Sequence, residues 1–160
     1  MDLARTITSQ TTIMFTNIET TLDAVSESDL HDKNIAGLTL GQQLYHLIMS
    51  LNQWFINPDL YYEHARHSMH LVSAAEITKT MLASYCTAIK GRIMAYLQGL
   101  DSAALGEPPE GGQYARLDLI LGQLQHGNYR LGLIHSCLGV HSGGAGPDYI
   151  SLESTFKPRE

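Results

Sequence analysis

The feature that most constrains the fold of this chain is a helical spacing of apolar residues, which recurs in four separate stretches. The first stretch covers residues 3–25, and its apolar positions lie three, four or seven residues apart: Leu3, Ile7, Met14, Ile18, Leu22 and Val25. Thr39 is a suitable N-cap for the second stretch, which ends before Asn57-Pro58 and has a regular apolar face: Leu40, Leu44, Leu47, Ile48, Leu51, Trp54 and Phe55. A sustained β-strand alternation is found nowhere in the chain.

Two further stretches follow in the second half of the sequence. Ser73, with Glu76 three residues later, is typical of a capping box, and the third stretch runs from there to Leu100. The fourth runs from about Tyr114 to Val140 and ends at the glycine-rich segment HSGGAGPD. Four helices joined by loops predict an all-α four-helix bundle. Residues 57–72 lack a helical stripe and predict a long connection between helices two and three, while YISLESTF predicts a short C-terminal tail.

Composition limits the size and the partners of this protein. With 160 residues and 44% hydrophobic content, the chain suits one domain spanning residues 1–160. Ten basic and sixteen acidic side chains give a net charge of −6 without a basic cluster, which argues against nucleic acid as a partner. We also expect no membrane span or signal peptide, and therefore a cytoplasmic protein. The two cysteines, Cys86 and Cys137, lie in apolar helical patterns and are expected to be buried free thiols.

The fourth stretch carries two stripes on roughly opposite sides of its helix. The first is a heptad-like core seam with two polar interruptions: Leu117, Leu121, Leu124, Asn128, Leu131, His135 and Leu138. The second mixes apolar and polar side chains: Leu119, Gln123, His126, Arg130, Leu133 and Cys137. A helix with two such faces is normally covered on both sides. We therefore expect one face in the bundle core and the other against a pocket, the tail or a second subunit.

His126 and Arg130 are the polar pair that most needs explaining in this helix. They are four residues apart and so lie on nearly the same face, whereas His135 lies about half a turn round the helix from His126 and cannot share a mononuclear site with it. Cys137 is about 16 Å along the axis from His126, which is too far for a nucleophilic Cys–His pair. The chain also lacks a G-x-S-x-G elbow and a phosphate loop.

Two segments, GLTLGQQLYHLIMSLNQWF and QLQHGNYRLGLIHSCLGVHSGGAGPDYI, resemble the DinB-like, or YfiT-like, superfamily, and the resemblance covers almost all 160 residues. It implies a four-helix bundle in up-down-down-up order. His46 corresponds to the first metal-ligand histidine of that family. In the fourth-helix pattern His-x-x-x-His-Arg-Gly, His126 matches the first histidine and Arg130 falls on the second. Leu131 then falls on the usual arginine, and Gly132 matches the glycine.

This resemblance also implies a metal chemistry that one substitution alters. Typical members hold nickel or zinc with three histidines, and some are thiol-dependent transferases or isomerases. Arg130 has no lone pair to donate and would repel a dication, so His46 and His126 alone would form a weak metal site. We therefore expect no tightly bound metal. The segment 57–72 contains further candidate ligands, but their spacing favours a solvated loop: Glu63, His64, His67 and His70.

Three functions remain open on this basis. The first is a metal-free pocket in which Arg130 pairs with an anionic ligand or an acidic neighbour, while His46 and His126 supply hydrogen bonds. The second is a weakened divalent-metal enzyme acting on thiols, as a transferase or isomerase. The third is a structural or interaction protein without catalysis. We also expect a homodimer, because the fourth helix has two faces and because aromatic residues cluster at the end of helix two: Trp54, Phe55, Tyr61 and Tyr62.

Overall fold

The computed structural model describes residues 2–32, 34–35, 37–57 and 72–141, and in this part of the chain the protein is all-α, as expected. Its long helices are α1 (Leu3–Ala24), α3 (Leu40–Trp54), α5 (Lys79–Gln98) and α6 (Arg116–His141). The smaller elements are helix α2 (Glu27–Asp32), an antiparallel ribbon of β1 (Asn34–Ile35) and β2 (Leu38–Thr39), and the 3₁₀ turns η3 (Ala74–Glu76) and η4 (Ala104–Gly106). None of the described helices is long and apolar enough to cross a membrane.

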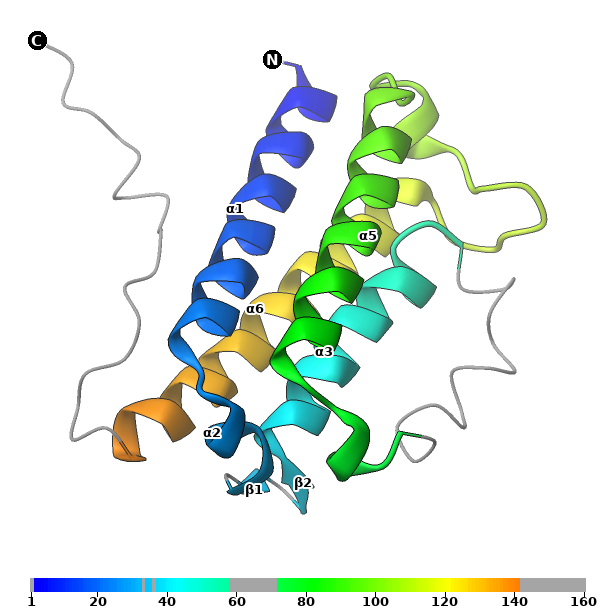
Figure 1. Cartoon of the computed structure of the whole chain (residues 1–160). Helices are drawn as coiled ribbons and strands as arrows, with labels where there is room; N and C mark the ends of the chain where they lie inside the picture. Colours follow the sequence, from blue (N-terminus) through cyan, green and yellow to red (C-terminus); the bar gives the residue numbers. More distant parts are fainter. Residues whose placement is uncertain (1, 33, 36, 58–71, 142–160) are drawn as a thin grey trace, which may run out of the picture.

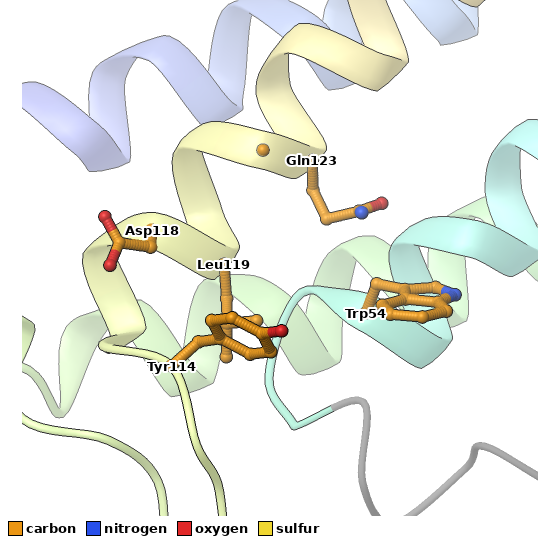
Figure 2. Close-up of a pocket in the computed structure, with 6 residues that line it drawn as sticks. Trp54, Tyr114, Asp118, Leu119 and Gln123 are labelled. Carbon is orange, nitrogen blue, oxygen red and sulfur yellow. The ribbon is translucent and has the colours of Figure 1, made fainter.

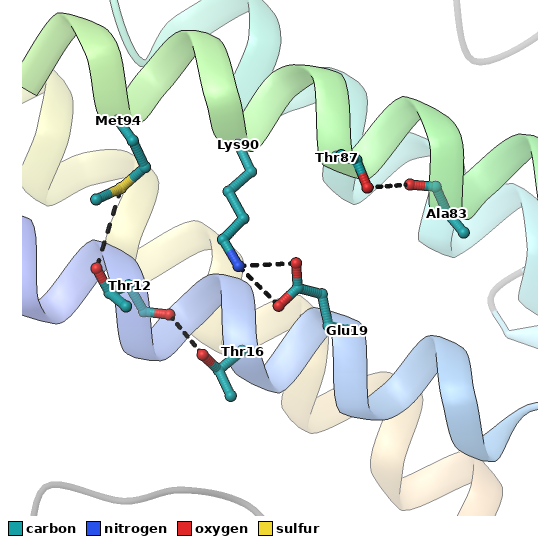
Figure 3. Close-up of polar contacts among 7 residues, drawn as sticks. All are labelled: Thr12, Thr16, Glu19, Ala83, Thr87, Lys90 and Met94. Carbon is teal, nitrogen blue, oxygen red and sulfur yellow. Dashed lines mark hydrogen bonds and ion pairs between the residues drawn. The ribbon is translucent and has the colours of Figure 1, made fainter.

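The helix starts follow from side-chain caps. Thr39 accepts a hydrogen bond from the Gln42 backbone N–H, and the Gln42 side chain accepts one from the Thr39 N–H, so the expected cap is a complete capping box. Six threonine hydroxyls of α1 donate to the carbonyl four residues earlier, and Figure 3 shows the contact from Thr16 to the carbonyl of Thr12. The polar groups of this threonine-rich helix are therefore satisfied locally.

The third helix begins later than the sequence pattern predicts. Ser73 and Glu76 do form a capping box, but it opens only the short turn η3. Ile77 then adopts an extended backbone and is buried in the core, which interrupts the helical hydrogen bonding. The long helix α5 starts two residues further on, at Lys79, where the Thr78 side chain caps it.

The four long helices pack in a cyclic order. Helix α1 packs against α5 and α6, and α3 packs against the same two helices on the other side. In Figure 1 the chain runs downward in α1 and α6 and upward in α3 and α5. All four helices contribute to one buried core, whose largest fully buried side chains include Phe15, Ile18, Leu44, Leu51 and Leu82. The neighbours α3 and α6 are thus antiparallel along their shared seam.

The core-facing side of α6 differs from the predicted seam. Two expected seam positions face solvent: Leu121 is 42% exposed, and Asn128 is also exposed. The buried face is instead formed by residues that lie further round the helix: Ile120, Leu124, Gly127, Leu131, Ile134 and Leu138. Gly127 belongs to this buried face because its missing side chain leaves room for Met14 of α1, whose sulfur would lie 2.6 Å from a Cβ at position 127. A count of apolar side chains does not include such a glycine.

Two predicted segments fall mainly outside the described residues. Most of the expected long connection lies within residues 58–71, and the C-terminal tail lies within residues 142–160. The candidate residues of the connection are therefore not placed: Tyr61, Tyr62, Glu63, His64, His67 and His70.

Candidate functional site

His46 of α3 and His126 of α6 meet across the seam between the two helices. Their ring centroids are 5.7 Å apart and the ring planes are nearly perpendicular, at 82°. Both side chains are half-buried. The two histidines are eighty positions apart in the sequence, yet their imidazoles are neighbours in the structure. The structure brings together the two histidines that the resemblance selects.

Two facing rows of side chains, most of them polar, extend from this pair along α3 and α6. Gln43, His46, Ser50 and Trp54 are spaced three, four and four residues apart on α3, so they lie along one side of that helix. The matching positions on the antiparallel α6 are Arg130, His126, Gln123 and Leu119. Arg130 pairs with Gln43 by a hydrogen bond, and His126 with His46 by ring contact. The second stripe of α6 therefore faces α3 and borders the core, instead of lying opposite to it.

Two adjacent cavities open along this seam. The first has a volume of about 220 Å³ and is lined by His46, Ser50, Trp54, Gln123 and His126. The second, of about 270 Å³, is lined by six residues: Trp54, Tyr114, Asp118, Leu119, Gly122 and Gln123. Figure 2 shows the second cavity, with Trp54 on one side and Tyr114 and Leu119 on the other. Because Trp54 and Gln123 line both cavities, the cavities are neighbours along the seam between α3 and α6, and the two together are called the α3–α6 groove.

Arg130 lies next to the histidines but is not among the residues that line either cavity. Its Nη1 donates a hydrogen bond to the buried Oε1 of Gln43 at 3.2 Å. Its guanidinium still acts on the site through its charge, because it lowers the pKa of both histidines. Arg130 is therefore a fixed positive charge beside the wall of these two cavities.

The two imidazoles are neutral at neutral pH. Burial is the main cause that lowers the pKa of His46 to about 4, and the charges of Arg130 and His126 add to it. Burial, and then Arg130, also lowers the pKa of His126. Each ring thus has one N–H donor and one acceptor nitrogen at neutral pH.

Several buried polar atoms at this seam have no hydrogen-bond partner among the described residues. They are His46 Nδ1, His126 Nε2, Gln123 Oε1 and Arg130 Nε. Buried polar atoms are nearly always paired in folded proteins, so four such atoms along one seam need a physical reason, and three of them belong to residues that line the 220 Å³ cavity. A bound polar molecule or ordered water would satisfy them.

The described residues do not supply a full ligand set for a tightly bound dication. No group of three His, Cys, Asp or Glu side chains is placed to hold a metal ion in the described ranges. His46 and His126 provide two neutral nitrogen donors, whereas a catalytic zinc site needs three protein ligands and an open position. The neighbouring Arg130 adds a positive charge that opposes a cation.

The other candidate groups lie away from this groove. A hydrogen bond of 2.8 Å joins His135 Nε2 to the Thr21 hydroxyl of α1, so His135 contributes to the contact between α1 and α6, away from His126 as expected. Cys86 is buried and burial raises its pKa to about 12, which makes it an unreactive thiol. Cys137 is only half-buried, in contrast to the expectation, and neither cysteine forms a disulfide.

Sequence reasoning missed the α3 side of the groove. Gln43, Ser50 and Trp54 were not selected as site residues, although with His46 they form a regular stripe at helical spacing. This polar stripe on α3 and the polar second stripe on α6 together indicate that the two faces pack against each other.

Comparison with known families, curated proteins and solved structures gives no match. The resemblance to the DinB-like superfamily therefore rests on the two sequence segments that carry it.

Proposed function

We propose that this chain is a cytoplasmic DinB-like protein with an up-down-down-up bundle, whose α3–α6 groove binds a small molecule without a tightly bound metal. The observation that carries the proposal is the contact between His46 and His126, with ring centroids 5.7 Å apart at the wall of a 220 Å³ cavity. The helix directions in Figure 1 agree with the proposed bundle order.

The metal-free assignment follows from the charge on Arg130. Its guanidinium already disfavours protonation of His46 and His126, which means that an added positive charge on either ring is opposed. A divalent cation bound to the same rings would carry twice the charge of a proton, so the guanidinium would repel it about twice as strongly at the same distance. Two imidazoles alone would then lose the metal to a mild chelator.

The ligand that suits this site is a small anion or a thiol. Neutral imidazoles donate through one nitrogen, and the charge of Arg130 makes the potential in the cavity more positive. A negatively charged head group would gain from both effects, and it would provide acceptors for the buried N–H groups that lack a partner.

The test measures metal content and ligand-induced stabilisation in parallel. Wild type and Arg130→His are incubated with zinc or nickel and dialysed, and we expect only the variant to retain metal. Close to one metal per wild-type chain would replace our proposal by a divalent-metal-dependent thiol transferase or isomerase. Thermal unfolding is then followed with acetate, inorganic phosphate and a small thiol. We expect stabilisation that His126→Gln abolishes and that His31→Gln, an exposed control on α2, retains.

A non-catalytic role as a structural or interaction homodimer is the second candidate, and the solvent-facing side of α6 favours it. From residue 119 onward, the described exposed residues of α6 carry no charge: Leu121, Gly122, Gln125, Asn128, Tyr129, Gly132 and Ser136. The other reason for a dimer is weaker than expected, because Phe55 is fully buried in its own core. Sedimentation should show a dimer that Tyr129→Glu converts to monomer, and a monomeric wild type at micromolar concentration would contradict this candidate.

A further inference from the structure

The cavity between Trp54 and Tyr114 contains neither histidine in its lining, so it can hold a different part of the ligand from the part that reaches the histidine pair. We propose that it is the subsite for a planar aromatic ring, and that the ligand of this groove is an aromatic monocarboxylate whose acid group reaches His46 and His126. This inference rests on the proposed function, because it assigns the chemical class of the ligand to the same groove.

The first step is that one molecule can occupy both cavities. Trp54 and Gln123 line both cavities, so a ligand that extends past these two side chains would reach from one cavity into the other. Each cavity alone, at about 270 and 220 Å³, is smaller than the range of roughly 300–1,000 Å³ typical of ligand pockets. The groove as a whole therefore fits an elongated ligand better than two separate ones.

Second, the 270 Å³ cavity, called the outer cavity, has a shape and polarity that suit an aromatic ring. Trp54, Tyr114 and Leu119 supply its main apolar surfaces, and Figure 2 shows the two aromatic rings on opposite sides. Gly122 leaves room, since no described atom lies within 4 Å of where its Cβ would be. A cavity of roughly 150 Å³ is enough to hold benzene, so 270 Å³ admits an aromatic ring between the two side chains.

The third step is the exposure of Tyr114. Its side chain is 59% exposed although it sits beside a cavity, so the bundle core does not account for it. A ring bound against Tyr114 and Trp54 would bury part of this surface. Trp54, which is half-buried, likewise keeps part of its surface available to the groove.

Fourth, the 220 Å³ cavity, called the inner cavity, would hold the acid head group of the ligand. The lining of the inner cavity contains the imidazoles of His46 and His126 but no cationic side chain, and Arg130 is bonded to Gln43 outside this lining. Neither a carboxylate nor a phosphate would find a direct cationic partner in the lining, and a carboxylate with one negative charge costs less to desolvate there than a doubly charged phosphate. The carboxylate of Asp118 points away from Trp54 in Figure 2, so it does not occupy the path of the ligand.

Trp54 makes the experiment direct, because it is the only tryptophan in the chain and lies between the two cavities. Its fluorescence is titrated with benzoate, with acetate as the head group alone, and with benzyl alcohol as the ring without the charge. We expect benzoate to bind at least about tenfold more tightly than either fragment. Tyr114→Ala should weaken benzoate binding about fivefold and leave acetate binding unchanged.

Tyr129→Ala is the matched control, because Tyr129 is a tyrosine of similar exposure, 65%, on α6 outside both cavities. It should bind benzoate as the wild type does. If His126→Gln weakens benzoate binding but Tyr114→Ala does not, the aromatic subsite is wrong and the proposed pocket stands. Binding of acetate with no gain for benzoate would likewise rule out the aromatic subsite alone. If no probe at millimolar concentration changes the fluorescence or the melting temperature, both the subsite and the carboxylate-binding pocket are wrong.

Discussion

Arg130 of α6 donates a hydrogen bond to Gln43 of α3, and this contact lies one helical turn from the meeting of His46 and His126. Arg130, which stands where the resemblance would place a third histidine, therefore has a partner on the opposite helix. Its charge stays close enough to lower the pKa of both histidines. The same residue thus joins the two helices and adds to the effect of burial, which is the main cause of the lowered pKa of both histidines.

Removing this charge should change the titration of the histidines. In Arg130→Met the pKa of His46 should rise above its value of about 4, and the pKa of His126 should rise as well, because a positive neighbour no longer opposes protonation. Burial remains the larger cause, so both should stay below the usual value of about 6.5. Histidine NMR signals followed against pH measure this, with Arg5→Met at the exposed start of α1 as control. An unchanged His46 pKa would show that Arg130 is not its electrostatic neighbour.

The histidine pair should also make stability depend on pH. The pKa of His46 is lower in the folded protein, so the unfolded chain binds more protons between about pH 6.5 and 4. Stability should therefore fall as the pH drops through this window, by at most about 1.4 kcal/mol per pH unit for one group. Urea unfolding at a series of pH values should give a shallower slope between pH 6.5 and 5 for His46→Gln than for wild type. Equal slopes would mean that His46 is protonated in the folded state.

Gly127→Ala should destabilise the bundle although alanine is the better helix former. The added Cβ would lie 2.6 Å from the Met14 sulfur, and overpacking of this kind costs about 1–3 kcal/mol, which exceeds the helix-propensity gain of about 1 kcal/mol. Gly91→Ala on α5 is the control, since no described atom lies within 4 Å of its Cβ position. Denaturant unfolding should show a lower midpoint for the first variant and an equal or higher midpoint for the second. A stabilised Gly127→Ala would show that Met14 moves aside freely.

The ion pair between α5 and α1 should contribute little to stability. Lys90 Nζ lies 2.8 Å from both carboxylate oxygens of Glu19, as Figure 3 shows, but the two side chains are 31% and 40% exposed. Water and salt screen such a pair, so Lys90→Met should change the free energy of unfolding by no more than about 1 kcal/mol. Any loss should shrink further at high salt. A loss of several kcal/mol that salt does not reduce would contradict this assignment.

The positions of the helices could be predicted from the sequence where local interactions decide them. The capping box at Thr39 joins residues within one turn, and the apolar spacing of α1 repeats with the period of a helix. Both patterns can therefore be recognised in the sequence. The start of α5 could not be predicted in this way. Ser73 and Glu76 form the expected local contacts, but burial of Ile77 against the rest of the bundle interrupts the helix.

The candidate site depended on packing to a greater degree. Spacing alone gives His46 no better chance of facing a pocket than of facing solvent, and only the resemblance selects it. In the packed bundle α6 buries the face that contains Gly127, so Leu121 faces solvent and the stripe of His126 and Arg130 faces α3. Helical periodicity therefore determines which side chains share a face, because it follows from the backbone geometry of each helix. Which faces meet is decided by close packing between helices, and it brings together residues such as Gly127 and Met14 that are more than one hundred positions apart in the chain.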